Sequence, residues 1–263
     1  MISSSTVSLL QSLSGSSSSQ SLFNAIYGGG SATSADPVAA LASAEKNQTK
    51  AVEKQAKDPQ TKRDVDHFTA VLAKAKDIKS LLADPIARKV LLTANGLGDQ
   101  ADYTALATKA LQSDSSKTGN LASKLSDTRW LAMAKSYDFA NKGLTVLKQQ
   151  SAIKALTSGY AEVQWRESLE QTTPGLSAAL EFRSNAGTVK SVDDILGNSN
   201  LRKVVTTALG IPQQIAFQSL QAQEKAISNR LDITKLKDPK FVEQFARRFL
   251  FANATNTSSS YLA

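Results

Sequence analysis

The sequence predicts an all-α protein, and three observations lead to that prediction. First, the segment DIKSLLADPIARKVLLTANGL at 77–97 recurs weakly at 191–211 as SVDDILGNSNLRKVVTTALGI, and both copies have the pattern of short capped helices. Second, the dipeptide Asp-Pro recurs along the chain, and it is typical of helix starts because Asp caps and Pro fits the first turn. Third, the alternation of apolar and polar residues that indicates strands is nearly absent.

The two ends of the chain differ from its body. Residues 1–35 carry no charged side chain and are rich in Ser, so they bury too little apolar area to offset chain entropy and are expected to be disordered alone. This segment is either a plain linker or contains a short helix that orders on a partner. The second possibility depends on apolar residues at helical spacings, namely Leu22, Phe23, Ile26 and Tyr27. The uncharged end, 253–263, is expected to be a second disordered tail.

Four Asp-Pro pairs, at residues 36, 58, 84 and 238, mark predicted helix starts in the body. Between them, helical periodicity and further caps complete the pattern. Helices are predicted over 37–57, 59–76, 101–112, 118–125, 127–140, 145–171, from Pro174, over 212–230 and from Pro239. We therefore expect a multi-helix bundle of two related halves, 36–143 and 144–252, each with one copy of the repeat, between tails 1–35 and 253–263.

The positions that the two repeat copies share fall where a short helix needs them. Asp84 and Asn198 are equivalent cap residues, and Gly96 and Gly210 are equivalent stops. The predicted buried positions are Ile86, Val90, Leu91 and Ala94 in the first copy and Leu201, Val204, Val205 and Ala208 in the second. The repeated segment is therefore a folding unit rather than a catalytic signature.

A pair of basic residues is also shared between the copies, on the face opposite the apolar positions. These residues are Arg88 and Lys89 in the first copy and Arg202 and Lys203 in the second. They are either solvated surface or a common contact for a protein partner. A formal charge of +8 favours an acidic partner. Nucleic acid is not expected, because the basic residues are scattered among acidic ones without interleaved stacking aromatics.

The composition makes most catalytic chemistries improbable. The chain has no Cys and a single His, His67, so thiolate catalysis, disulfides and ordinary zinc sites are not expected. An enzyme that uses carboxylates stays as an alternative, on pairs such as Glu167/Glu170 or Asp64/Asp66 beside His67. Such pairs are also frequent on solvated helices, so neither an enzyme nor a cofactor is expected. Neither a membrane span nor a general secretory signal is expected either.

Several segments of the body together resemble a known bacterial family. They are TKRDVDHFTAVLAKAKDIKSLLADP, LTANGL, YTALATKALQSDSS, LASKLSDTRWLAMAKSYDF, YAEVQWRESLEQTTPGLSAALEF and DPKFVEQFARRFL. The resemblance covers roughly residues 36–252, and LSDTRW and LQSD are its most specific parts. The family is an uncharacterised domain of unknown function that is often encoded in flagellar gene clusters of alphaproteobacteria.

The resemblance implies a role in the flagellum and assigns no catalytic residue. We expect a non-enzymatic, flagellum-associated structural or assembly protein that acts through protein–protein interaction, with a flagellar component as its partner. The alternative is a cytoplasmic chaperone-like or regulatory module that binds a flagellar subunit. The expected location is the bacterial cytoplasm or the flagellum, with export by the flagellar route left open, as is homo-oligomerisation.

Overall fold

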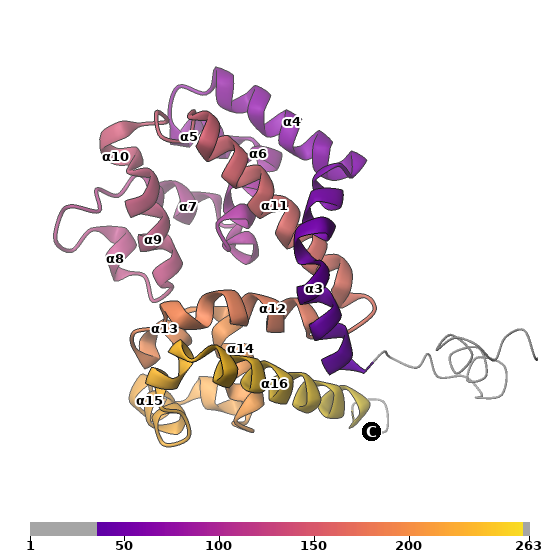
Figure 1. The fold of residues 1–263 in the computed structure, drawn as a ribbon. Coiled ribbons are helices and arrows are strands. Elements are labelled where there is room, and N and C mark those ends of the chain that lie inside the picture. Colours follow the sequence, from indigo (N-terminus) through magenta and orange to yellow (C-terminus); the bar gives the residue numbers. More distant parts are fainter. Residues whose placement is uncertain (1–35, 260–263) are drawn as a thin grey trace, which may run out of the picture. The chain divides into compact units, whose positions relative to one another are not determined.

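The computed structural model describes residues 36–259, with side chains to residue 255. All regular elements in this part of the chain are helical and no strand occurs there, which confirms the all-α prediction (Figure 1). The predicted partner residues Leu22, Phe23, Ile26 and Tyr27 lie outside the described residues. Within 36–259, no helix is long and apolar enough to cross a membrane.

The helices follow one another with short connections. The α-helices are α3 (Pro37–Ala56), α4 (Pro59–Lys74), α5 (Ile78–Ala83), α6 (Pro85–Ala94), α7 (Thr104–Leu111), α8 (Leu121–Lys124), α9 (Thr128–Tyr137), α10 (Phe139–Lys142), α11 (Gln150–Glu170), α12 (Leu176–Asn185), α13 (Val192–Gly197), α14 (Ser199–Ala208), α15 (Leu220–Ser228) and α16 (Pro239–Ser259). Four 3₁₀ segments lie between them: η1 (Gly98–Gln100), η2 (Ala186–Thr188), η3 (Gln213–Phe217) and η4 (Ile233–Lys237).

Some predicted helix boundaries and one predicted buried position are wrong. The single helix expected over 212–230 is divided into η3 and α15, because Ser219 caps a new helix by accepting a hydrogen bond from the backbone N–H of Ala222. The helix expected over 127–140 is interrupted at Asp138, whose φ of 48° is left-handed. Ile86, expected in the buried stripe, is 39% exposed. Helix α16 continues to Ser259, past the boundary placed after residue 252.

Two hydrophobic cores hold the helices together. The first core gathers buried side chains of α4 to α7, of α9 and α10 and of the first part of α11, among them Phe68, Leu91, Trp130 and Tyr160. The second gathers those of α12 to α16, the end of α11 and part of α3, among them Leu41, Trp165, Phe182 and Phe249. The residues of the two cores therefore do not divide along the chain as the expected halves 36–143 and 144–252 do, because α3 packs into the second core and α11 contributes to both.

Both copies of the repeat form the same pair of short helices, α5–α6 and α13–α14. Each pair opens on a capping box, formed by Asp77 with Ser80 in the first copy and by Ser191 with Asp194 in the second. The following helix is capped as predicted: Asp84 accepts a hydrogen bond from Ala87, and Asn198 accepts from Asn200 and Leu201. These caps satisfy backbone donors that the first turn of a helix leaves without a partner.

The stop at the end of each copy is also the same. Gly96 and Gly210 have φ of 74° and 63°, which an L side chain rarely adopts. The next residue turns back to the helix, so that Leu97 donates its N–H to the Leu92 carbonyl at 2.8 Å, and Ile211 donates to Thr206 at 2.8 Å. This bond closes a Schellman turn. The structure therefore confirms that the segment shared by 77–97 and 191–211 is a repeated folding unit.

Candidate functional site

In each basic pair of the repeat, the arginine forms a hydrogen bond with the end of the preceding helix. Arg88 donates to the carbonyl of Leu82 at 2.7 Å and to that of Ala101 at 2.7 Å, so it fixes the end of α5. The equivalent Arg202 donates to Leu196 at 3.4 Å, at the matching end of α13. Lys89, Arg202 and Lys203 are exposed. The shared arginine therefore has a structural contact in each copy, while the partner role of the basic pairs stays a prediction.

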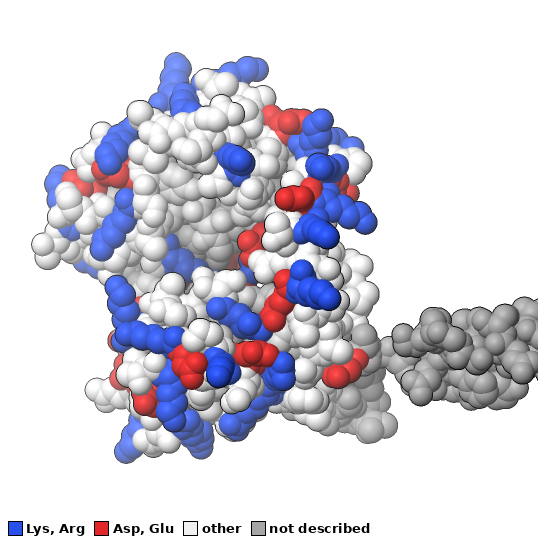
Figure 2. Space-filling view, viewed as in Figure 1, with Lys and Arg blue, Asp and Glu red and all other residues white. Residues whose placement is uncertain are grey.

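Arg202 and Lys203 line a groove of about 480 Å³ between α14 and η3, called here the α14 groove. Its other lining residues are polar or apolar, and none of those described is acidic. Phe217 belongs to this lining and is 92% exposed, and Leu220, three residues on, is 57% exposed. Figure 2 shows basic and acidic side chains interspersed on the face that it draws, as expected for solvated helix faces. The groove is thus a basic and aromatic site on a mixed surface.

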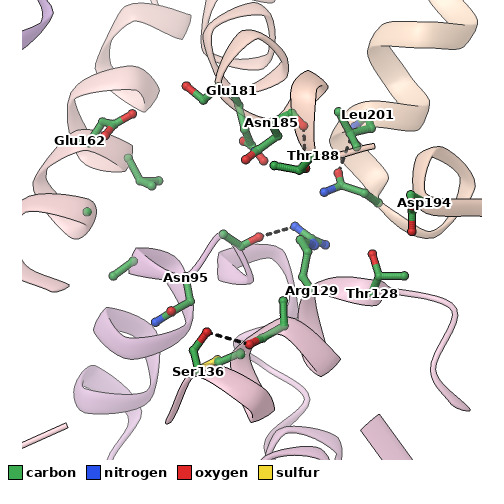
Figure 3. Close-up of a pocket in the computed structure, with 18 of the residues that line it drawn as sticks. Asn95, Thr128, Arg129, Ser136, Glu162, Glu181, Asn185, Thr188, Asp194 and Leu201 are labelled. Atoms are coloured by element: carbon green, nitrogen blue, oxygen red, sulfur yellow. Dashed lines mark hydrogen bonds between the residues drawn. The ribbon is translucent and has the colours of Figure 1, made fainter. Parts of the chain in front are cut away.

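The LSDTRW segment joins the two copies of the repeat through Arg129. Asp127 caps α9 and pairs with this guanidinium, its Oδ2 lying 2.6 Å from Arg129 Nη2. Arg129, labelled in Figure 3, also donates to the carbonyl of Gly96, the stop of the first copy. It donates as well to Asp99 at 3.1 Å. Asp99 in turn accepts a hydrogen bond at 2.8 Å from Ser199, the first residue of α14. Polar contacts therefore run from the end of copy one to the second helix of copy two.

A close approach of two backbones lies next to this network. A Cβ added at Gly197, the last residue of α13, would lie 1.8 Å from the carbonyl oxygen of Ser126. A glycine is therefore required for the segment before α9 to pack against the second copy.

The LQSD segment shapes the loop between α7 and α8. Asp114 accepts hydrogen bonds from the hydroxyl of Ser116 at 2.6 Å and from its N–H at 3.0 Å, and from Asn141 of α10 at 3.3 Å. The two bonds from Ser116 lower the pKa of Asp114 from 3.8 to about 2. The carboxylate thus ties the loop to α10.

The depressed pKa of Asp114 predicts a loss of stability in acid. Because the folded-state pKa lies below the unfolded value, this carboxylate stabilises the fold above about pH 4, and its contribution disappears as the pH falls toward about 2. Asp114→Asn keeps an acceptor oxygen without the titration, so its urea midpoint should fall less over this range. Urea unfolding at a series of pH values measures the difference. Equal pH dependence in the two proteins would contradict the assignment.

Two of the carboxylates considered for catalysis, Asp64 and Glu170, are engaged in structural contacts. Asp64 accepts a hydrogen bond from the hydroxyl of Tyr160 at 2.6 Å, and burial together with this bond raises the pKa of Tyr160. His67 Nε2 lies 2.9 Å from the cap residue Asp84, and Glu170 accepts from the N–H of Gly175 at 2.7 Å. Among the residues that the structure describes, no group of three or more His, Asp or Glu could hold a metal ion.

A cavity of about 530 Å³ opens between the helices of the two cores. One wall comes from the end of α6 and from α9, with Asn95, Thr128 and Ser136; the other comes from α11 to α14, with Glu162 and Glu181 (Figure 3). The same hollow is visible in the space-filling view (Figure 2). Several of its polar groups are already bonded within the protein: Asn95 accepts from Tyr137, and Ser136 donates to Ala132.

A charged pair in this cavity has no hydrogen bond. Arg166, whose side chain is 9% exposed, has its Nε 4.0 Å from Glu162 and its Nη1 4.0 Å from Glu181. Its Nε is buried without a hydrogen-bond partner. Burial raises the pKa of Glu181 although the guanidiniums of Arg166 and Arg129 act in the opposite direction. At 4.0 Å, Arg166 is close enough to Glu162 and Glu181 for electrostatic attraction but too far from them for a hydrogen bond.

Comparison with known proteins identifies the family. A model described as a protein of unknown function (DUF1217) matches residues 94–242, more than half of the chain. The chain belongs to the DUF1217 family. The DUF1217 match begins at the last residue of α6 and contains the LQSD and LSDTRW segments and the second copy of the repeat. This confirms the expected membership of an uncharacterised family.

A solved structure supports the fold. The crystal structure of protein AGR_C_984 from Agrobacterium tumefaciens is similar to this chain, with a TM-score of 0.69 and 26% sequence identity over 85% of this chain and 96% of that one. Among curated proteins, none matches the chain.

Sequence reasoning missed two features of the site. The sequence predicts a continuous helix through Phe217, although Ser219 carries the capping signal that starts a new one. The sequence does not single out Arg166 and Glu181, because nothing in it shows that α11 and α12 face each other across a cavity.

Proposed function

We propose that this protein is a non-enzymatic, flagellum-associated structural or assembly protein that acts by binding another protein at the α14 groove. The observation that carries the interaction is Phe217, a large apolar side chain that is 92% exposed beside Arg202 and Lys203. Aromatic and arginine side chains are enriched at the energetic centres of protein interfaces. The flagellar assignment is supported by the resemblance of the folded body to a family found among flagellar genes.

The charge of the groove indicates the kind of partner. The described lining contains two basic residues and no acidic one, and the whole chain carries a formal charge of +8. A second copy of this chain would bring an equally basic protein, so an acidic partner surface is favoured. We expect acidic side chains to meet Arg202 and Lys203 while an apolar pocket receives Phe217.

Deletion of the gene in a flagellated host is the first test. The expected result is impaired motility or filament assembly, together with co-purification of the protein with a flagellar component. Unchanged motility and no flagellar component in the purified material would contradict the proposal.

Phe217→Asp should abolish that co-purification and leave the fold intact, because it removes the exposed aromatic and adds a charge that acidic side chains repel. The matched control is Tyr103→Asp, at a side chain that is 60% exposed and outside the groove. Circular dichroism checks the fold of both variants. Co-purification of Phe217→Asp at the wild-type level would place the interface elsewhere.

The alternative is a cytoplasmic chaperone-like or regulatory module. The helical spacing of Phe241, Phe245 and Phe249 on α16 would suit a groove for a partner helix, but Phe245 and Phe249 are buried in the second core. Fractionation separates the two functions. The structural role predicts the protein in purified flagella or culture supernatant, whereas the alternative predicts it in the cytoplasm, bound to an unassembled subunit.

A further inference from the structure

The cavity between the two cores holds an arginine and two glutamates that form ion pairs at 4.0 Å without a hydrogen bond between them. Arg166 has nitrogen atoms 4.0 Å from Glu162 and 4.0 Å from Glu181, and its side chain is only 9% exposed. Within the described residues, neither Arg166 nor Glu181 forms a hydrogen bond, and Arg166 Nε is buried without an acceptor. Buried polar groups in proteins are normally hydrogen-bonded, so Arg166 has hydrogen-bonding capacity left for a group from outside the chain.

The surrounding charges restrict the chemistry of that group. A simple anion would satisfy Arg166 but would come close to the carboxylates of Glu162 and Glu181, which repel it. A simple cation would suit the carboxylates and would leave Arg166 Nε without an acceptor. The ligand therefore needs an anionic acceptor and a cationic donor a short distance apart.

The remaining lining indicates where the rest of a ligand would lie. Met133, Val163, Val189 and Leu201 contribute apolar surface to the same cavity. Its volume of about 530 Å³ falls within the range of about 300–1,000 Å³ typical of small-molecule sites. A second, smaller cavity of about 290 Å³ shares Arg166 and Glu181.

We propose that this cavity binds a free α-amino acid with an apolar side chain. Its carboxylate accepts hydrogen bonds from Arg166, its ammonium group donates to Glu181 and Glu162, and its side chain contacts Met133, Val163 and Leu201. Because the walls come from both cores, the bound amino acid also links the two groups of helices. The lining of this cavity shares no residue with the α14 groove, whereas the smaller cavity includes Ser199 and Lys203 of that groove.

Isothermal titration calorimetry on the full chain tests the ligand. The probes are L-leucine, L-methionine and L-phenylalanine, each compared with its N-acetyl and its carboxamide derivative, which lack the ammonium and the carboxylate respectively. We expect at least one free amino acid to bind and both of its derivatives to bind at least about tenfold more weakly. Absence of binding by all three at millimolar concentration, or equal binding of the derivatives, overturns the proposal.

Two variants test the residues. Arg166→Lys and Glu181→Gln should each weaken binding at least about tenfold, since each removes one charge-assisted contact or its geometry. The matched control is Arg247→Lys, on the exposed Arg247–Glu243 pair of α16, which should bind as the wild type does. Wild-type affinity in Glu181→Gln overturns the assignment. If Arg166→Lys does not fold, Glu181→Gln and the derivative series still decide the question.

Discussion

Arg129→Ala is expected to lower the free energy of unfolding by about 3–5 kcal/mol. The side chain of Arg129 is 14% exposed, and it pairs with Asp127 and Asp99 and donates to the carbonyl of Gly96. Its removal leaves the largely buried carboxylate of Asp127, the more exposed carboxylate of Asp99 and the Gly96 carbonyl without their cation, and the uncompensated burial of Asp127 is the costly step.

The control for Arg129 is Arg247→Ala. Arg247 pairs with Glu243 one turn away on α16 and is 44% exposed, so its removal should cost less than about 0.5 kcal/mol. Urea unfolding followed by circular dichroism measures both proteins. If Arg129→Ala lowers the free energy of unfolding no more than Arg247→Ala does, the contacts of Arg129 with Asp127, Asp99 and Gly96 do not hold the structure together.

Gly197→Ala is expected to destabilise the protein by about 3 kcal/mol or more. The new Cβ would lie 1.8 Å from the carbonyl oxygen of Ser126 and 2.8 Å from its carbonyl carbon. Both are backbone atoms, so neither can move away by a rotamer change, and the contact between α13 and the segment before α9 must open.

Gly187→Ala is the matched control, because a Cβ there meets nothing within 4 Å and the backbone needs no left-handed φ. It should leave the stability within about 0.5 kcal/mol or raise it slightly through reduced entropy of the unfolded chain. The urea midpoints of the two variants should therefore differ clearly. Equal midpoints would mean that the close approach at Gly197 does not constrain the fold.

The local features of the fold could be predicted from the sequence, because they depend on neighbouring residues. Asp84 and Asn198 cap their helices and Gly96 and Gly210 end them, as expected from residue types at fixed spacing. The interruption at Ser219 was missed although it is local, because Pro212 and the apolar spacing after it favoured one continuous helix.

The features that join distant parts of the chain could not be predicted. Arg129 and Ser199 meet through Asp99, and no periodicity indicates which loop lies against which helix. For the same reason the sequence pattern predicts an outward arginine in the repeat, whereas Arg88 folds back on the end of α5. The exposure of Phe217 likewise depends on the placement of η3 relative to the second core, which no local pattern indicates.

The central structural claim is that the LSDTRW segment makes the two cores unfold as one unit. The chain has two tryptophans, Trp130 in the first core and Trp165 in the second, so Trp165→Phe and Trp130→Phe each leave a reporter for one core. In each variant, tryptophan fluorescence should follow the same urea transition as the circular dichroism of that protein. A fluorescence transition that is displaced from the circular dichroism transition in either variant would show that the cores unfold independently, and would contradict the claim.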